Sequence, residues 1–327
     1  MSTPTAGIRG RLLGPWPGGT VWLVRRQHRS AFRAGAALVA AAIAYIVWRR
    51  WELTSFIDAH AFPACPKGVA GCMGGTPATP RGVEGTAQGY GGLGDAVVRA
   101  GQALLALPAL IGVFAGAPLF ARELESGTHK LVWAQSVGRV RWLLVKLLLP
   151  AASVTAGTAG VAAAYHWWWA PAQTFSRKLG DYQTNPYVVS WWQAAPFNAT
   201  GPLAVGLAVL GLVIGATAGL LLRRTVPAMA VALGVVVAAQ WGATALRGHL
   251  ASSVVVTKRE DGVWPVPRDT WWGSESRTDG RPGTRDWAEI HPPSDFWRIQ
   301  WIEAGICLVL AAALAVFCVW WIRRRPV

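Results

Sequence analysis

Six stretches of this sequence are apolar over nearly the length of a bilayer-crossing helix, which limits the possible folds more than any other feature. Crossing the hydrocarbon core takes roughly 20 apolar residues as a helix, because about 30 Å must be covered at about 1.5 Å per residue. The runs are about 34–51, 100–120, 147–169, 203–222, 226–246 and 304–322. The sequence therefore predicts an all-α polytopic membrane protein with six transmembrane helices and long outer loops.

Composition agrees with this class. Hydrophobic residues make up 53% of the chain and charged residues only 14%, whereas a soluble domain has about 25% charged residues. The first run begins only after a long leader and is followed by Arg49, Arg50 and Trp51 instead of a small-residue cleavage site. We therefore expect a retained first span and not a signal peptide.

The basic residues indicate how the chain is oriented. Lys and Arg number 31 against 16 Asp and Glu, and they are densest in the leader, in 121–146, at 223–224 and at 323–325. By the positive-inside rule these segments face the cytoplasm, which places both termini there. The basic surplus then reflects topology in the lipid bilayer, so we expect no nucleic acid partner. The expected location is the plasma membrane.

The chain divides into a cytoplasmic tail, 1–33, and a six-span transmembrane domain, 34–327. In the tail, the stretch from Val21 to Arg33 has apolar residues at helical spacing opposite several arginines. This pattern predicts an N-terminal interfacial helix lying on the inner membrane surface; the alternative is a solvated basic leader. The residues expected on this helix are Arg25, Arg26, His28 and Arg29.

Few residues of this chain suggest bond-making chemistry. It lacks a Cys-x-x-Cys pair, an H-E-x-x-H pattern and a G-x-x-x-x-G-K-[ST] loop, so we expect no metal, no cofactor and no ATPase activity. The match of Gly89–Gly94 to G-x-G-x-x-G follows no strand and is interpreted as a flexible lead into the second span. Cys65 and Cys72 lie in a polar outer segment, where a disulfide is possible if that segment is oxidised.

The spans themselves hold almost no ionisable residues. Arg99, Lys146 and Glu303 stand at the ends of runs, where long side chains can reach the interface. An ion path through the spans is therefore not expected.

The segment after the second run, 121–142, holds the only two acids on the expected cytoplasmic side, Glu123 and Glu125. Thr128 can cap a short helix that ends near Gly138. One face of that helix would carry Leu131, Val132 and Gln135. Such a helix can dock into a partner. The residues support equally well an interfacial turn packed on the protein's own spans, with both acids paired to nearby arginines.

This segment resembles the coupling-helix region of ABC transporter permeases of the type 2 exporter class. In that class a Glu-x-Glu-x-Gly-Thr pattern precedes a short cytoplasmic coupling helix, a basic cluster and a Lys that enters the third span. The matching residues are Glu123, Glu125, Gly127, Thr128, Arg139, Arg141 and Lys146. The family often has a Pro near the end of the coupling helix, where this chain has Ser136-Val137. The stretches 26–29, 222–227 and 291–297 resemble permease-like proteins from actinobacteria.

The resemblance implies the permease subunit of an ATP-driven exporter of a hydrophobic or amphipathic substrate. ATP and magnesium would be held by a separate cytoplasmic ABC ATP-binding subunit, and a second permease subunit, identical or different, would complete the transporter. The coupling residues would be Glu123, Glu125, Gly127, Thr128, Leu131, Val132, Gln135, Arg139 and Arg141, and none would be catalytic. The alternative is a membrane-anchored binding or sensory protein with ligand-binding outer loops and a cytoplasmic docking loop.

Overall fold

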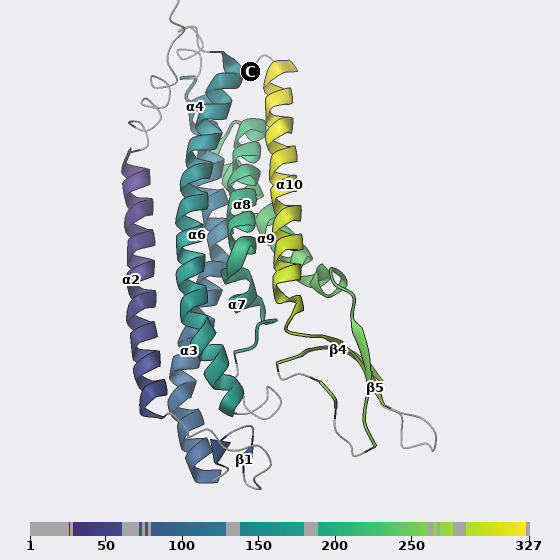
Figure 1. Cartoon of the computed structure of the whole chain (residues 1–327). Coiled ribbons are helices and arrows are strands. Elements are labelled where there is room, and N and C mark those ends of the chain that lie inside the picture. Colours follow the sequence, from purple (N-terminus) through teal and green to yellow (C-terminus); the bar gives the residue numbers. More distant parts are fainter. Residues whose placement is uncertain are drawn as a thin grey trace, which may run out of the picture.

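The structure, a computed structural model, describes residues 26, 29–60, 72–73, 76–77, 80–128, 138–179, 189–260, 264–266, 269–276 and 286–324. Within these residues, six helical segments are long and apolar enough to cross a membrane. They are Arg29–Ala59, Gly89–Glu125, Arg139–Ser176, Gly201–Leu222, Thr225–His249 and Asp295–Arg324. The predicted all-α polytopic membrane fold with six transmembrane helices is confirmed (Figure 1).

The helices are α2 (Arg29–Ala59), α3 (Pro80–Leu110), the π-helix η1 (Ile111–Gly116), α4 (Ala117–Glu125), α6 (Arg139–Leu179), α7 (Ala194–Ala199), α8 (Gly201–Leu222), α9 (Thr225–Leu246), the 3₁₀ turn η2 (Arg247–His249) and α10 (Asp295–Arg324). Helices α3, η1 and α4 follow one another without a break and together form the second span. The strands are β1 (Cys72–Met73), β2 (Thr76–Pro77), β3 (Val254–Thr257), β4 (Trp271–Ser276) and β5 (Trp287–His291).

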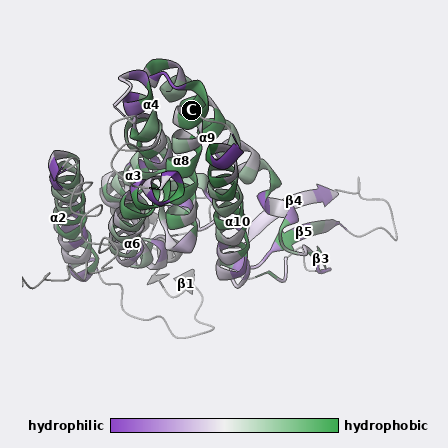
Figure 2. Ribbon diagram, turned by 90° about the horizontal axis from the view of Figure 1, so that it is seen from above, coloured by the Kyte–Doolittle hydropathy of each residue, from purple (hydrophilic) through white to green (hydrophobic). Residues whose placement is uncertain are grey.

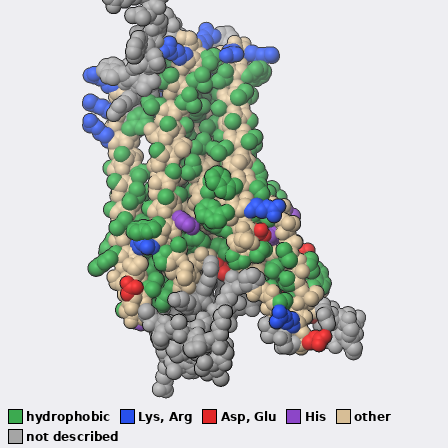
Figure 3. Space-filling view, in the orientation of Figure 1, with side chains coloured by type: hydrophobic (Ala, Val, Ile, Leu, Met, Phe, Trp, Pro, Cys, Tyr) green, Lys and Arg blue, Asp and Glu red, His purple; other side chains and the backbone are tan. Residues whose placement is uncertain are grey.

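The bundle has two chemically different ends. At one end, here called the basic end, lie the start of α2, the end of α4, the turn between α8 and α9, and the end of α10 (Figure 1). Figure 3 shows Lys and Arg side chains gathered there, while the carboxylates visible on that face lie nearer the opposite end. At that opposite end, the sheet end, strands β3, β5 and β4 form an antiparallel sheet in that order.

Helix α8 is the centre of the bundle. Its sequence is apolar on all sides, as expected of a helix surrounded by others, and nearly every residue from Leu203 to Leu220 is buried. It contacts α10, η1, α4, α6 and α9, and the view down the bundle shows it among them (Figure 2). By contrast, α2 lies at the periphery, packs mainly on α6, and buries only Ile46 and Leu53 fully.

Four spans, the first, second, third and sixth, extend well beyond the predicted runs, and the second and third show why. The Gly-rich stretch around Gly89, expected to be a flexible lead, is instead part of α3. Tyr90 is fully buried there and donates a hydrogen bond to the carbonyl of Ala172, at 3.0 Å, so this part of α3 is held against α6. Contacts outside the apolar run therefore maintain helical structure that periodicity alone did not predict.

Helix α6 continues through Pro171, which cannot donate a hydrogen bond to the carbonyl of Trp167 one turn earlier. The guanidinium of Arg50 takes that role: its Nη1 donates to the Trp167 carbonyl, and its Cζ lies 3.8 Å from the centre of the Trp167 ring. A side chain of α2 therefore satisfies the carbonyl that the proline leaves free, which keeps α6 continuous.

The long segment after α9, expected as an outer loop, contains the three-stranded sheet. Trp271 of β4 packs edge-on against Trp191, with ring centres 6.1 Å apart, and lies 4.9 Å from the ring of His291. Trp191 donates a hydrogen bond from Nε1 to the carbonyl of Asp269, at 2.8 Å. Aromatic packing and this hydrogen bond attach the sheet to the bundle.

Candidate functional site: a helix junction at the basic end

The second span ends in a defined turn. The backbone N–H of Ser126 bonds to the carbonyl of Arg122 at 3.1 Å, and Gly127 has φ of 71°, a left-handed conformation that favours glycine. The hydroxyls of Ser126 and Thr128 are 2.9 Å apart. The chain thus leaves α4 at the point where the Glu-x-Glu-x-Gly-Thr pattern ends. The next described helix, α6, begins at Arg139.

Glu123 links α4 to α6. Its carboxylate pairs with Nζ of Lys146, and the two side chains are only 13% and 3% exposed. The Lys146 ammonium also lies 5.2 Å from the ring of Trp142, which packs against Phe120 of α4. The expectation that Lys146 extends to the interface is wrong: an opposite charge on the neighbouring helix makes burial of the ammonium tolerable.

Glu125 links α4 to α9. One carboxylate oxygen, Oε2, accepts hydrogen bonds from the backbone N–H and the hydroxyl of Thr225, at 3.0 and 2.8 Å. Thr225 is the first residue of α9, and the first N–H groups of a helix have no partner within it. A carboxylate at this position also interacts favourably with the positive end of the helix dipole. Glu125 therefore acts as an N-terminal cap supplied by another span.

These contacts make one junction of three spans. Two acids, separated by a single residue on α4, hold the start of α6 and the start of α9. We name this arrangement the α4 junction and define it by Glu123, Glu125, Lys146 and Thr225. In these contacts Glu123 pairs with a lysine and Glu125 caps a helix. The alternative of an interfacial turn packed on the protein's own spans involves the segment 129–137, which lies outside the described residues.

The other predicted site residues fall in several places. Arg139 is exposed and Arg141 is half-buried, and both lie in the first turn of α6. Arg26 and Arg29 are exposed, and Arg29 is the first residue of α2. Leu131, Val132, Gln135, Arg25, His28 and Cys65 lie outside the described residues, and Cys72 is described only as part of β1. The coupling helix and the disulfide therefore remain predictions.

Sequence reasoning missed an irregular region in the second span just before the junction. Pro108 interrupts the hydrogen bonds of α3, and the π-helix η1 follows it directly. The side chain of Gln240 on α9 donates to the carbonyl of Leu105 at 2.9 Å. Such π-helical turns inside α-helices are often found at functional sites. A proline within the second apolar run was the available signal.

Glycines bring this irregular region close to α8. A Cβ on Gly215 would lie 2.0 Å from the carbonyl oxygen of Gly112, and one on Gly116 would lie 2.4 Å from that of Leu212. The helices therefore touch backbone to backbone, as small residues allow between membrane helices. The four-residue spacing of Gly211, Gly215 and Gly219 in the fourth run was the signal for this contact.

A second missed feature lies at the sheet end, where Arg247 and Glu303 form an ion pair with both side chains at most 3% exposed. Glu303 was expected to reach the interface, and this is wrong because Arg247 holds it inside the bundle. Opposite charges at matching ends of the fifth and sixth runs were the signal. Among the residues that the structure describes, no three His, Cys, Asp or Glu side chains are grouped to hold a metal ion.

Comparison with known families adds to this geometry. The model of a family described as ABC-2 membrane transporter related matches residues 36–247, which is more than half of the chain. No curated protein and no solved structure matches the chain. The matched region extends from α2 to Arg247 and contains the whole α4 junction. The chain is therefore a membrane transport component that belongs to the ABC-2 membrane transporter related family.

Proposed function

We propose that this chain is the transmembrane permease subunit of an ATP-driven ABC exporter, and that the α4 junction passes the partner's movement into the spans. The observation that carries the proposal is the pair of contacts made by Glu123 and Glu125. A force applied to the segment 129–137 acts on the ends of α4 and α6, and Glu125 extends it to α9. Three spans would then move together.

The irregular second span supports this role. Because Pro108 and η1 replace regular α-helical bonding, the second span can bend there at a lower cost than in a continuous α-helix. At Gly215 the backbones of the second span and α8 meet directly, with no side chain between them at that point. Movement at the α4 junction can therefore be accommodated within the second span.

Charge distribution supports an orientation with the basic end in the cytoplasm. Arg122, Arg139, Arg223 and Arg323 lie at or next to the helix ends that form the basic end, in accord with the positive-inside rule. Both termini and the segment 129–137 then face the cytoplasm of a bacterial cell, where an ATP-binding subunit is reachable.

The proposed partners follow from what the chain would need. The motor is a cytoplasmic ABC ATP-binding subunit that holds ATP and magnesium, and Leu131, Val132 and Gln135 are the residues proposed to contact it. A second permease subunit, identical or different, would face this one across the substrate path. The substrate is proposed to be hydrophobic or amphipathic, because the apolar runs 100–120, 147–169, 203–222, 226–246 and 304–322 hold no Asp, Glu, Lys or Arg.

Capture of the complex tests the proposal. The full chain is isolated from its native membranes in mild detergent, and the captured material is assayed for Mg²⁺-dependent ATPase activity. The test variant replaces 129–137 by a Gly-Ser segment of equal length, and the control variant makes the same replacement at 277–285, between β4 and β5 in the sequence. We expect the activity to be lost only with the first replacement. Equal capture of an ATPase by both variants would contradict the coupling role.

A further inference from the structure

The segment from Val189 to Thr200 enters the bundle at the sheet end and is buried there without spanning it. Ser190, Trp191 and Phe197 are each at most 1% exposed, although part of this segment is not helical. Its short helix α7 packs on α3, where a Cβ on Gly101 would lie 2.9 Å from the backbone of Ala195. Irregular backbone buried in a membrane-spanning bundle is tolerated only where protein groups or water satisfy its polar atoms.

Two polar side chains, Arg247 of η2 and Gln300 of α10, bond to this buried segment. Gln300 donates to the carbonyl of Phe197 at 2.6 Å and accepts from the N–H of Leu203 at 3.3 Å. Arg247 donates from Nη2 to the Asn198 side-chain oxygen and lies 3.9 Å from the centre of the Phe197 ring. The buried segment is thus held by contacts with two other elements.

Glu303 fixes Arg247 in this position. Its two carboxylate oxygens accept from Nε and Nη2 of the guanidinium at 2.7 and 3.2 Å, a two-point pairing that sets the orientation of the arginine. Hydrophobic residues of the same volume often stabilise such a buried site as well as an ion pair does. A buried, hydrogen-bonded charge pair therefore contributes orientation, and here the oriented group is the one that holds Asn198.

We propose that the segment 189–200 is a plug that closes the sheet end of the transport path, and that the Arg247–Glu303 pair is the latch that holds the plug shut. This rests on the proposed function for its role in transport. If α10 and the end of α9 separate, Arg247 and Gln300 move apart. Their hydrogen bonds to Asn198 and Phe197 can then no longer be made at the same time, and the plug is released.

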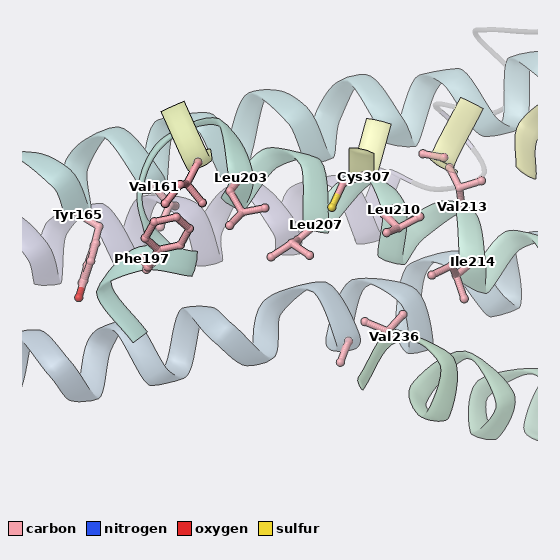
Figure 4. Packing of buried hydrophobic residues seen from close by; sticks show 14 of the residues in the cluster. Val161, Tyr165, Phe197, Leu203, Leu207, Leu210, Val213, Ile214, Val236 and Cys307 are labelled. Carbon is pink, nitrogen blue, oxygen red and sulfur yellow. The ribbon is translucent and has the colours of Figure 1, made fainter. Parts of the chain in front are cut away.

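A small cavity lies beside α7. Asn198 and Ala199 of the plug line it together with Pro108 of the irregular region in the second span and Gln240 of α9. Figure 4 shows Phe197 beside Leu203 and Leu207 of α8, with Cys307 deeper along the bundle. Release of the plug would therefore open the cavity and the buried side chains behind it to the sheet end.

Cys307 provides a native reporter for this opening. It is a free thiol, 5% exposed, two helical turns beyond Gln300 along α10. The full chain, with its other three cysteines replaced by serine, is placed in lipid nanodiscs and reacted with a charged maleimide. Nanodiscs expose both ends of the bundle, so the result does not depend on orientation, nucleotide or an ATPase.

The latch predicts a specific pattern of labelling rates. In the Glu303→Gln and Arg247→Met variants, Cys307 should react with the maleimide at least about tenfold faster than in the parent chain. Removal of one charge leaves the other buried and unpaired, which weakens the latch. The exchanged pair, Arg247→Glu with Glu303→Arg, should return toward the parent rate. The control is Arg99→Gln, which removes an exposed pair with Asp95 on α3 and should not alter the rate.

Asn198→Ala keeps the Arg247–Glu303 pair but removes the hydrogen bond from Arg247 to the plug. Cys307 should also react faster in this variant than in the parent chain. This variant decides the matter if the charge variants fail to fold. Folded variants that label at the parent rate, Asn198→Ala included, would overturn the latch. No ATPase takes part in the labelling experiment, so such a result leaves the permease proposal standing. Conversely, if the latch variants label faster but no ATPase is captured with the chain, only the proposed coupling to an ATPase is overturned.

Discussion

The carboxylate of Glu123, near the end of α4, pairs with the ammonium of Lys146, two turns into α6, and both side chains are nearly withdrawn from solvent. Neither group could be buried alone at an acceptable cost. The pair therefore ties the second span to the third on both sides of the segment 129–137. This gives the basic end a fixed geometry, on which the proposed ATP-binding subunit would act.

Removal of one member of this pair should destabilise the protein. Lys146→Met leaves the Glu123 carboxylate buried without its cation, and we expect a loss of about 3–5 kcal/mol in the free energy of unfolding. Denaturant unfolding in detergent measures this loss. The matched control is Lys258→Met, whose pair with Asp286 is partly exposed and should be worth about 0–1 kcal/mol. Equal losses for both variants would argue against a buried pair.

The glycine contact between η1 and α8 should not accept a methyl group. Gly215→Ala would place its Cβ 2.0 Å from the Gly112 carbonyl oxygen, so the helices must separate, at a cost of about 1–3 kcal/mol. Gly234→Ala on α9 is the control, since its Cβ would meet nothing within 4 Å, and it should be neutral or slightly stabilising. Thermal unfolding of both variants tests this difference.

The hydrogen bond from Arg50 to the Trp167 carbonyl should matter only while Pro171 is present. Arg50→Met should cost about 1 kcal/mol in the parent chain, the usual net value of a hydrogen bond. In a Pro171→Ala background, the alanine N–H can bond to the same carbonyl, and the cost should fall. A double-mutant cycle of unfolding free energies measures this coupling. Additive effects would show that the arginine does not replace the missing donor.

The number and place of the spans were predictable because each apolar run is long and bounded by charge. The ends were not, since α3 around Gly89 is held by contacts such as that between Tyr90 and Ala172. Hydropathy carries no trace of a partner 82 residues away in the sequence. The α3 and α6 helices therefore proved longer than their apolar runs.

The candidate site was predictable in part for a similar reason. The acidic pattern at Glu123 and Glu125 marked the right segment, but the groups that they contact were not evident. Thr225 lies 100 residues from Glu125, and its free N–H groups exist only because α9 begins there. Likewise, Arg247 and Glu303 could be placed at span ends, yet only packing brings the two spans together.

If the α4 junction moves as one unit, spin-label distances in the complex with the proposed ATP-binding subunit will show it. In a chain without its native cysteines, labels at Arg122 and Arg323 report the separation of α4 from α10, while labels at Arg122 and Val226 report a distance across the junction. All three positions are exposed. We predict that trapping MgATP changes the first distance and leaves the second constant. If the distance between Arg122 and Arg323 stays unchanged although nucleotide is demonstrably bound, the α4 junction does not move with the ATPase and does not couple it to the spans.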